Sequence, residues 1–350
     1  MQLDNINVEK LDVLITPEHL KAEFPLPEAV QSFIADARVA VENIVAKRDP
    51  RVLVVVGPCS IHDPQAAQEY AERLAGLSSQ LSDRLLLVMR AYFEKPRSTV
   101  GWKGLINDPY LDDSFRVDEG LKIARKLLLS ISATGLPIAT EALDPITPQY
   151  IQDLISWSAI GARTTESQTH REMAFGLSCP VGFKNGTDGS LAVAINALQS
   201  ATSQHSFLGI SPAGQVSVIH TRGNPHAHIV LRGGSSGPNY SEAHIKEAED
   251  ALRSIDHPLS IMVDCSHANA NKDHNQQSVV LTELGRQIAQ GNESITGVMI
   301  ESNLHAGKQA LGPDLTYGVS VTDPCVDWAQ TETMLHSFHE DIARRFNRSE

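Results

Sequence analysis

Long cationic side chains recur at one kind of position in this sequence, directly after a short apolar run. Arg90, Arg163, Lys184 and Arg232 follow four different runs. A guanidinium binds carboxylate or phosphate through paired hydrogen bonds, and an ammonium adds a point charge. One such arginine alone would be explained by a salt bridge. Four cations that converge on a single opening favour a polyanionic ligand.

A short loop adds further cations to the same set. Lys95 and Arg97 flank Pro96, whose fixed φ restricts the loop backbone, and Ser98 follows with a hydroxyl. The six cations together are enough to balance two phosphate groups, each about −2 near neutral pH, plus a carboxylate. The sequence therefore predicts either two phosphorylated small molecules or one bisphosphate as ligand.

A second group of side chains after the apolar runs could hold a metal ion. Cys59, His267, Glu301 and Asp323 offer one thiolate, one imidazole and two carboxylates. Such a mixed sulfur, nitrogen and oxygen set suits Mn, Fe, Co or Zn and disfavours Ca or Mg. Cys59 taken alone is explained by an inert buried thiol. The four taken together predict a metal site.

These side chains depend on eight apolar runs that recur along the chain. Each run is short and continuous rather than alternating, which is typical of strands buried on both faces of a parallel sheet. Helical stripes lie between them, as in 117–131 and 335–342. We therefore predict an α/β fold, a (β/α)8 TIM barrel, over a doubly wound open sheet. The runs are Leu53–Val56, Leu85–Met89, Pro137–Ala139, Ser158–Ala162, Val181–Phe183, His228–Leu231, Ile261–Val263 and Ile295–Ile300.

Two segments fall outside the eight predicted strand–helix units. Residues 27–45 carry their own apolar stripe and predict an extra helix ahead of the barrel. Between the fifth and sixth strands, apolar runs flank Ser211-Pro-Ala-Gly-Gln215, which predicts a β-hairpin. We expect an N-terminal arm and helix over 1–48 and a catalytic barrel over 49–350, with the hairpin inserted at 206–223. The hairpin is a candidate for oligomer contact or regulation, or a decorative insertion.

Composition excludes several classes of protein. The 350 residues carry a formal charge of −13, which disfavours nucleic acid and anionic membrane as partners. No apolar run approaches the roughly 18 residues of a spanning helix, and the first ten residues do not resemble a signal peptide. Four irregularly spaced cysteines make no disulfide framework. We expect a cytoplasmic protein.

Several motifs in order give a resemblance to a known family. The sequence closely resembles the class I 3-deoxy-D-arabino-heptulosonate 7-phosphate (DAHP) synthases of the feedback-regulated type, from about Pro27 to Phe346. This resemblance implies condensation of phosphoenolpyruvate with erythrose 4-phosphate, the first step of the shikimate pathway. The motifs are Gly57-Pro-Cys-Ser-Ile-His62, Lys95-Pro-Arg97, Gly161-Ala-Arg163, Gly182-Phe-Lys-Asn-Gly-Thr-Asp188, Leu231-Arg-Gly-Gly234, Asp264-Cys-Ser-His-Ala-Asn269 and Ile300-Glu-Ser302.

The resemblance also implies roles for particular residues. Cys59, His267, Glu301 and Asp323 match the metal ligands, for Mn2+, Fe2+ or Co2+, and Asp323 also borders the substrate. The phosphoenolpyruvate site is matched by Arg90, Lys95, Arg163, Lys184 and Arg232, and the erythrose phosphate side by Lys95, Arg97 and Ser98. Cys59, Lys95 and His267 are the implied catalytic residues, with Lys95 as a proton donor. Ser98 stands where the family has Thr, and Gly307-Lys-Gln309 replaces the usual Gly-Asn-Gln.

Feedback inhibition is a further implication of the resemblance. An aromatic amino acid would bind near the hairpin, and Gly209, where Phe-sensitive relatives tend to carry Ser, favours tyrosine. A homodimer or homotetramer is implied as well. The effector residues implied are Pro148, Gln149, Leu177, Ser178, Phe207 and Gly209.

Three alternatives compete with this hypothesis. A related synthase would use arabinose 5-phosphate, but the Lys95-Pro-Arg97 loop, the extra helix and the hairpin argue against it. A metal-dependent aldolase acting on a sugar bisphosphate would release no phosphate. A non-catalytic amino-acid sensor on a degenerate barrel would have lost metal ligands or cations, whereas all are present here.

Overall fold

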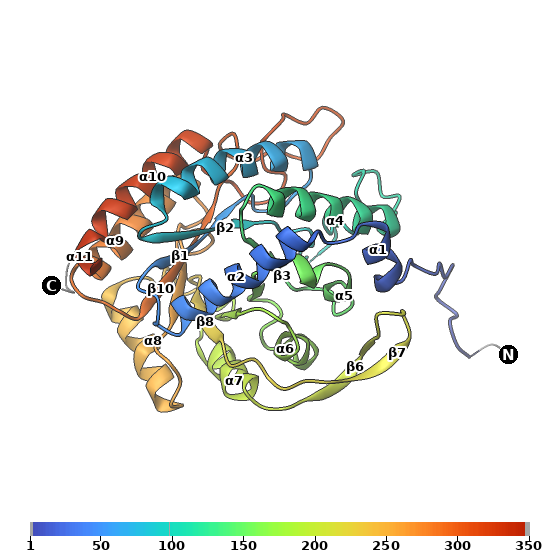
Figure 1. Ribbon diagram of the computed structural model, residues 1–350, viewed down its shortest axis with the longest axis horizontal. Coiled ribbons are helices and arrows are strands. Elements are labelled where there is room, and N and C mark those ends of the chain that lie inside the picture. The colour runs from blue at the N-terminus through green and yellow to red at the C-terminus, as the bar shows by residue number, and fades with distance from the viewer. Residues whose placement is uncertain (1–2, 98, 347–350) are drawn as a thin grey trace.

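A closed barrel of eight parallel strands forms the centre of the molecule (Figure 1). The computed structural model describes residues 3–97 and 99–346. The strands follow one another around the barrel in chain order, so the predicted TIM barrel is confirmed and the open-sheet alternative is wrong. The strands are β1 (Val52–Gly57), β2 (Leu85–Arg90), β3 (Ile138–Glu141), β4 (Trp157–Ile160), β5 (Val181–Lys184), β8 (Ala227–Leu231), β9 (Ile261–Asp264) and β10 (Ile295–Glu301).

The apolar runs form strands because both of their faces are covered. Every residue of β1 is buried, since one face meets the barrel interior and the other meets the helices. Parallel pairing on both sides holds β1 in register, with Val54 opposite Leu87 on β2 and Val298 on β10. The strand ends therefore come to one rim of the barrel.

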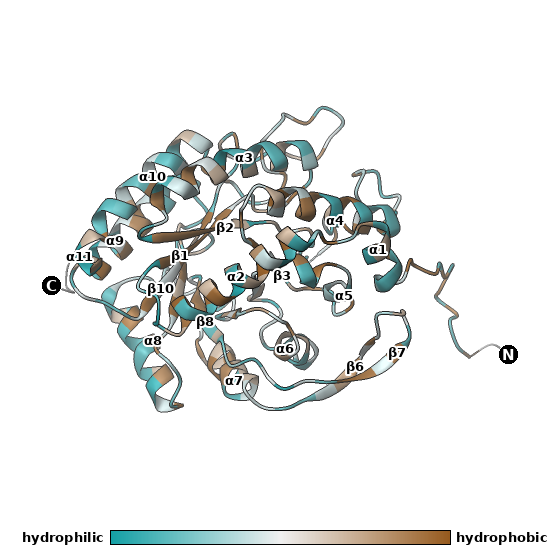
Figure 2. Ribbon diagram, viewed as in Figure 1, coloured by the Kyte–Doolittle hydropathy of each residue, from teal (hydrophilic) through white to brown (hydrophobic). Residues whose placement is uncertain are grey.

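Helices surround the barrel with their apolar stripes turned inward (Figure 2). In α4 the buried residues Leu121, Ala124, Leu128 and Ile131 follow the predicted stripe. The long helices are α3 (Pro64–Leu81), α4 (Val117–Ala133), α7 (Ala192–Ala201), α8 (Glu242–Ser254), α9 (Gln277–Ala289) and α10 (Trp328–Asp341). Shorter ones are α5 (Pro148–Ile151), η1 (Gln152–Leu154), α6 (Gln168–Phe175), η2 (His274–Gln276) and α11 (Ala343–Phe346).

Two helices precede the barrel, α1 (Pro17–Glu23) and α2 (Glu28–Val45). Helix α2 lies across the barrel in Figure 1. Its buried Val41, Ile44 and Val45 pack with interior side chains such as Leu53 and Val55. Helix α2 thus closes the amino end of the barrel and leaves the carboxyl end to the site. Helix α2 contributes side chains to the core of the barrel. The division of the chain into an N-terminal segment, 1–48, and a barrel, 49–350, stays a prediction.

The predicted hairpin is present between β5 and β8. Strands β6 (Ser206–Ile210) and β7 (Val216–His220) pair antiparallel, with Ile210 opposite Val216. The turn reaches α1, where the Glu18 amide donates to the Pro212 carbonyl at 2.9 Å. One face of the hairpin exposes Leu208, Val216 and Val218.

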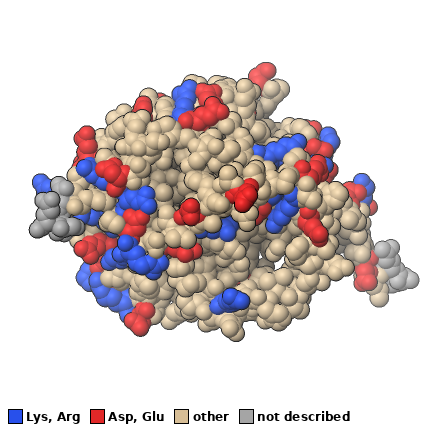
Figure 3. Space-filling view, in the orientation of Figure 1, with Lys and Arg blue, Asp and Glu red and all other residues tan. Residues whose placement is uncertain are grey.

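Charged side chains of both signs are interspersed over the face seen in Figure 3. That face therefore carries no large patch of one sign, although the whole sequence has a charge of −13. Within residues 3–97 and 99–346, no helix is both long and apolar enough to cross a bilayer.

Candidate active site

The candidate residues meet at the carboxyl rim because the strands end there. Arg90, Lys184, Asp264 and Glu301 are the last residues of β2, β5, β9 and β10. Arg163 and Arg232 come shortly after β4 and β8, and Cys59 follows β1. In a parallel barrel these ends point toward one opening, which is where barrel enzymes carry their sites.

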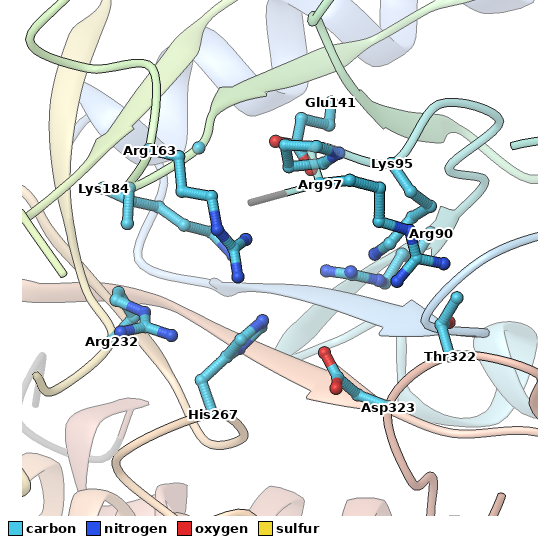
Figure 4. Close-up of a pocket in the computed structure, with 13 residues that line it drawn as sticks. Arg90, Lys95, Arg97, Glu141, Arg163, Lys184, Arg232, His267, Thr322 and Asp323 are labelled. Atoms are coloured by element: carbon cyan, nitrogen blue, oxygen red, sulfur yellow. The ribbon is translucent and has the colours of Figure 1, made fainter. Parts of the chain in front are cut away.

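A polar cavity of about 110 Å³ lies at this opening. Figure 4 shows the labelled cations pointing into it from opposite sides, with His267 and Asp323 below them. The six predicted cations all line it, as do Glu141 and Thr322; the cations are Arg90, Lys95, Arg97, Arg163, Lys184 and Arg232. Ser98 lies outside the described residues.

A thiol and two carboxylates form a compact group beside the cavity. The ligand atoms of Cys59, Glu301 and Asp323 lie within 4.8 Å of one another. Cys59 Sγ is 3.8 Å from Asp323 Oδ2. His267 lies next to this group, with Nε2 3.8 Å from Glu301 Oε1. The structure therefore brings the four predicted metal ligands together.

The chemistry of this group fits a divalent transition metal. Donors that share one ion at about 2.0–2.3 Å each lie no more than about 4.6 Å apart, and both 3.8 Å separations are below that limit. Burial and the Glu301 carboxylate raise the pKa of the Cys59 thiol, against Lys95 and Arg90. A bound cation would favour the thiolate that burial disfavours. Cys59, His267, Glu301 and Asp323 are thus the residues that would hold it.

One buried carboxylate connects this group to the phosphate side of the cavity. Asp264 Oδ2 lies 2.9 Å from His267 Nδ1 and accepts a hydrogen bond of 2.9 Å from Lys184 Nζ. Burial would raise the pKa of Asp264, but His267 and Lys184 hold it well below its usual range. His267 adopts a left-handed backbone (φ 55°), a strained conformation that is common at functional sites. Asp264 therefore orients both side chains at once.

Arg90 is buried deeper than the other cations. Its side chain is 1% exposed and donates to Glu301 Oε1 at 3.0 Å and to the carbonyls of Pro58 and Cys59. Its guanidinium also stacks on Tyr92, 3.6 Å from the ring centroid. Arg90 thus positions Glu301 and the Cys59 segment as well as bordering the cavity.

Lys95 lies directly against the thiol. Its Nζ is 3.3 Å from Cys59 Sγ and 3.2 Å from the Cys59 carbonyl oxygen. Burial alone would lower the pKa of Lys95, but Cys59 and the nearby carboxylates raise it above its ordinary value. The ammonium is therefore charged at neutral pH and can donate a proton or a hydrogen bond into the cavity.

Glu141 is a further residue of the site, beyond those predicted from the sequence. It ends β3 and lines the cavity, and within the described residues its buried Oε1 has no hydrogen-bond partner. Gly161 makes room for it, because a Cβ there would lie 2.3 Å from Glu141 Oε1. The sequence did hold a signal for this role, because Glu141 ends its apolar run just as the neighbouring cations end theirs. The free oxygen can accept a proton or hydrogen bond from a ligand.

A second carboxyl near the loop does not add negative charge. Glu94 is buried and accepts a hydrogen bond of 3.1 Å from Thr147 Oγ1. Burial and Asp144 raise the pKa of Glu94 to about 8. Glu94 is therefore a neutral acid at pH 7, and it does not cancel the charges of Lys95 and Arg97 beside it.

The predicted effector residues do not line this cavity, and they lie on three connected elements. Pro148 and Gln149 are in α5, Leu177 and Ser178 follow α6, and Phe207 and Gly209 are in β6. Helix α6 packs on β6, and α1 contacts both α5 and the hairpin turn. A Cβ at Gly209 would lie 2.8 Å from Ile219 Cγ1. A larger residue at position 209 would therefore displace Ile219.

Comparisons with known proteins agree along nearly the whole chain. A family model described as the DAHP synthetase I family matches residues 27–336. The chain is 57% identical to a Tyr-sensitive phospho-2-dehydro-3-deoxyheptonate aldolase of Salmonella typhimurium, over 97% of this chain and 96% of that protein. Its identity to the Phe-sensitive protein of Escherichia coli is 51%, over 98% and 99%.

A solved structure is similar over the same extent. The structure of phospho-2-dehydro-3-deoxyheptonate aldolase from Francisella tularensis superposes with a TM-score of 0.95 at 48% sequence identity. The alignment covers 97% of this chain and 99% of that one. The similarity therefore includes the N-terminal helices and the hairpin as well as the barrel.

Proposed function

The chain belongs to the DAHP synthetase I family, and from this premise we propose that it condenses phosphoenolpyruvate, erythrose 4-phosphate and water to DAHP and inorganic phosphate. The observation that carries the proposal is one cavity where six cations lie beside a thiol, an imidazole and two carboxylates. Six positive charges suit two phosphorylated substrates. The reaction is the first step of the shikimate pathway.

The cations have the task of binding and orienting two anions. Arg163, Lys184 and Arg232 line one side of the cavity and would hold the phosphate of phosphoenolpyruvate. Lys95 and Arg97, with Ser98, would hold erythrose 4-phosphate on the other side. Fixing both substrates in one geometry lowers the entropic cost of a reaction between two molecules.

Proton transfers are assigned to two side chains that both line the cavity, Lys95 and Glu141. The methylene carbon of phosphoenolpyruvate forms a bond to the aldehyde carbon, and Lys95 donates a proton to the aldehyde oxygen. Water then adds to the former enol carbon, and Glu141 accepts one of its two protons. As the C–O bond to phosphate breaks, the hydroxyl left on that carbon becomes the ketone of DAHP, and its proton leaves with the phosphate toward Arg163 and Arg232. A divalent metal held by Cys59, His267, Glu301 and Asp323 would supply Lewis acidity toward the aldehyde.

Two assays test this function, one in which the metal is removed and one in which two aldehyde substrates are compared. Loss of phosphoenolpyruvate and release of phosphate are followed together, with erythrose 4-phosphate or arabinose 5-phosphate as second substrate. We expect turnover with erythrose 4-phosphate only, its loss on chelation with EDTA, and its recovery when Mn2+, Fe2+ or Co2+ is added back. Equal turnover of arabinose 5-phosphate, or full activity in the chelator, would contradict the proposal.

We propose tyrosine as the feedback inhibitor, bound near Pro148, Gln149, Leu177, Ser178, Phe207 and Gly209. The identity to Tyr-sensitive relatives and the absence of a side chain at Gly209 support this choice. A Gly209→Ser variant fills space beside Ile219, so we expect its IC50 for tyrosine to rise about tenfold. Inhibition titrations with Tyr, Phe and Trp measure this. Inhibition of the parent protein by Phe alone would contradict the assignment.

The proposed setting is the cytoplasm, with a homodimer or homotetramer as the assembly. All four cysteines are free and buried, as expected in a reducing compartment. The exposed Leu208, Val216 and Val218 on the hairpin supply an apolar surface that a second copy could cover. Sedimentation equilibrium distinguishes the two assemblies, and a monomer at micromolar concentration would contradict both.

A further inference from the structure

A second cavity of about 250 Å³ adjoins the first. The two cavities have Arg163, Arg232, His267 and Asp323 as common lining residues. The second cavity, called the chamber below, therefore adjoins the proposed phosphate cations and is not a distant surface pocket. The substrate assignments given above leave it without a ligand.

Two lysines reach this chamber from different loops. Lys272 follows β9, and its amide donates to the His267 carbonyl at 2.9 Å, with a left-handed φ of 62°. Lys308 follows β10 in a segment fixed by bridges to Ser320 and, at Gly307, to Cys325. Both lysines are exposed, and neither forms an ion pair within residues 3–97 and 99–346. Both lysines therefore line the chamber from loops that backbone contacts hold in place.

The electrostatics of the chamber favour an anion. Burial lowers the pKa of Arg232, and the neighbouring Arg163 lowers it further, against Asp264. Two cations therefore repel each other in the wall common to the cavities. Of the acids that line the chamber, Glu301 and Asp323 belong to the candidate metal group. Asp273 is engaged by its own loop, where its carboxylate accepts from the Asn275 amide.

We propose that this chamber is a binding site for inorganic phosphate, distinct from the site that holds the phosphate of phosphoenolpyruvate. Phosphate freed beside Arg163 and Arg232 moves into it and is bound by Lys272 and Lys308 before it leaves the protein. The inference rests on the proposed function, because that reaction is what produces phosphate at the common wall.

Equilibrium dialysis with radiolabelled inorganic phosphate tests the site on the metal-loaded protein. Saturating phosphoenolpyruvate is present to fill the first site, and the aldehyde is left out so that no turnover occurs. We expect about one phosphate bound per chain. In the double variant Lys272→Gln, Lys308→Gln its Kd should rise at least about tenfold, or about 1.4 kcal/mol, because two charge-assisted hydrogen bonds to the phosphate are lost. Lys246→Gln removes an exposed lysine on α8 and is the matched control.

Each outcome decides the question. Complete loss of bound phosphate when phosphoenolpyruvate is saturating would overturn the proposal, and so would equal binding by the double variant and the parent. A double variant that changes only the KM for erythrose 4-phosphate would assign the lysines to the sugar phosphate instead. Turnover of the parent protein is measured separately. A protein that turns over but fails the dialysis test loses this inference and keeps the proposed function.

Discussion

Replacing Cys59 with alanine removes metal-dependent turnover and leaves the barrel folded. Cys59 supplies the sulfur donor of the candidate metal group, with Sγ 3.8 Å from Asp323 Oδ2. A Lewis-acid metal stabilises transition-state charge by several kcal/mol. At 1.36 kcal/mol for each factor of ten, its loss lowers kcat/KM on the order of 10³-fold. Equilibrium dialysis against Mn2+ gives a second readout, in which we expect metal affinity to fall as well.

The folded state of this variant is checked by circular dichroism and thermal unfolding. Cys179→Ala is the matched control, because Cys179 is also a buried free cysteine. Cys179 forms hydrogen bonds with Gln152 and Ser158 and does not line the cavity. We expect the Cys179→Ala protein to keep its activity and its metal affinity. Full activity of Cys59→Ala in an assay supplemented with metal would rule out the assigned ligand set.

The substitution Glu141→Gln is expected to cause a second large loss of activity, in this case a fall in kcat. Glutamine keeps the shape of the side chain but cannot take a proton from water. Among the described residues, Oε1 of Glu141 is buried and has no hydrogen-bond partner, and Glu141 lines the cavity. General acid–base groups contribute about 10²–10⁴-fold to a rate. We therefore expect kcat to fall by this factor while the KM for phosphoenolpyruvate changes much less. A variant with unchanged kcat would exclude Glu141 as the proton acceptor.

Glu94→Gln is the control for this prediction, because it changes a buried carboxyl that is already neutral. With a pKa of about 8, Glu94 carries its proton at pH 7, so the substitution should change kcat little there. The folded protein keeps that proton up to about pH 8, whereas the unfolded chain releases it near 4.5. The free energy of unfolding of the parent therefore falls as pH rises through this range. Urea titrations at pH 5.5 and 8 should show that the free energy of unfolding falls less between these pH values in the Glu94→Gln variant than in the parent protein.

The apolar runs determined the fold because they leave few arrangements open. Eight short, continuous runs need cover on both faces, and a parallel barrel with outer helices provides it. Once the strands are parallel, their ends must come to one rim, so Arg90, Lys184 and Glu301 could be expected together from the sequence. The charge of −13, taken alone, argues against anionic ligands of any kind. The position of the cations at the strand ends is what predicted a small anionic ligand.

The tertiary structure decided which of these side chains act on one another. The position of a residue at a strand end shows that its side chain lies near the others at the rim. The direction in which that side chain points depends on the barrel register and on the loop backbone. Only the structure shows that Asp264 joins His267 to Lys184, and that Arg90 donates to Glu301. Burial is likewise a property of the packed molecule. It made Glu94 a neutral acid beside Lys95 and Arg97 and left Glu141 facing the cavity, although the sequence presents both as ordinary glutamates.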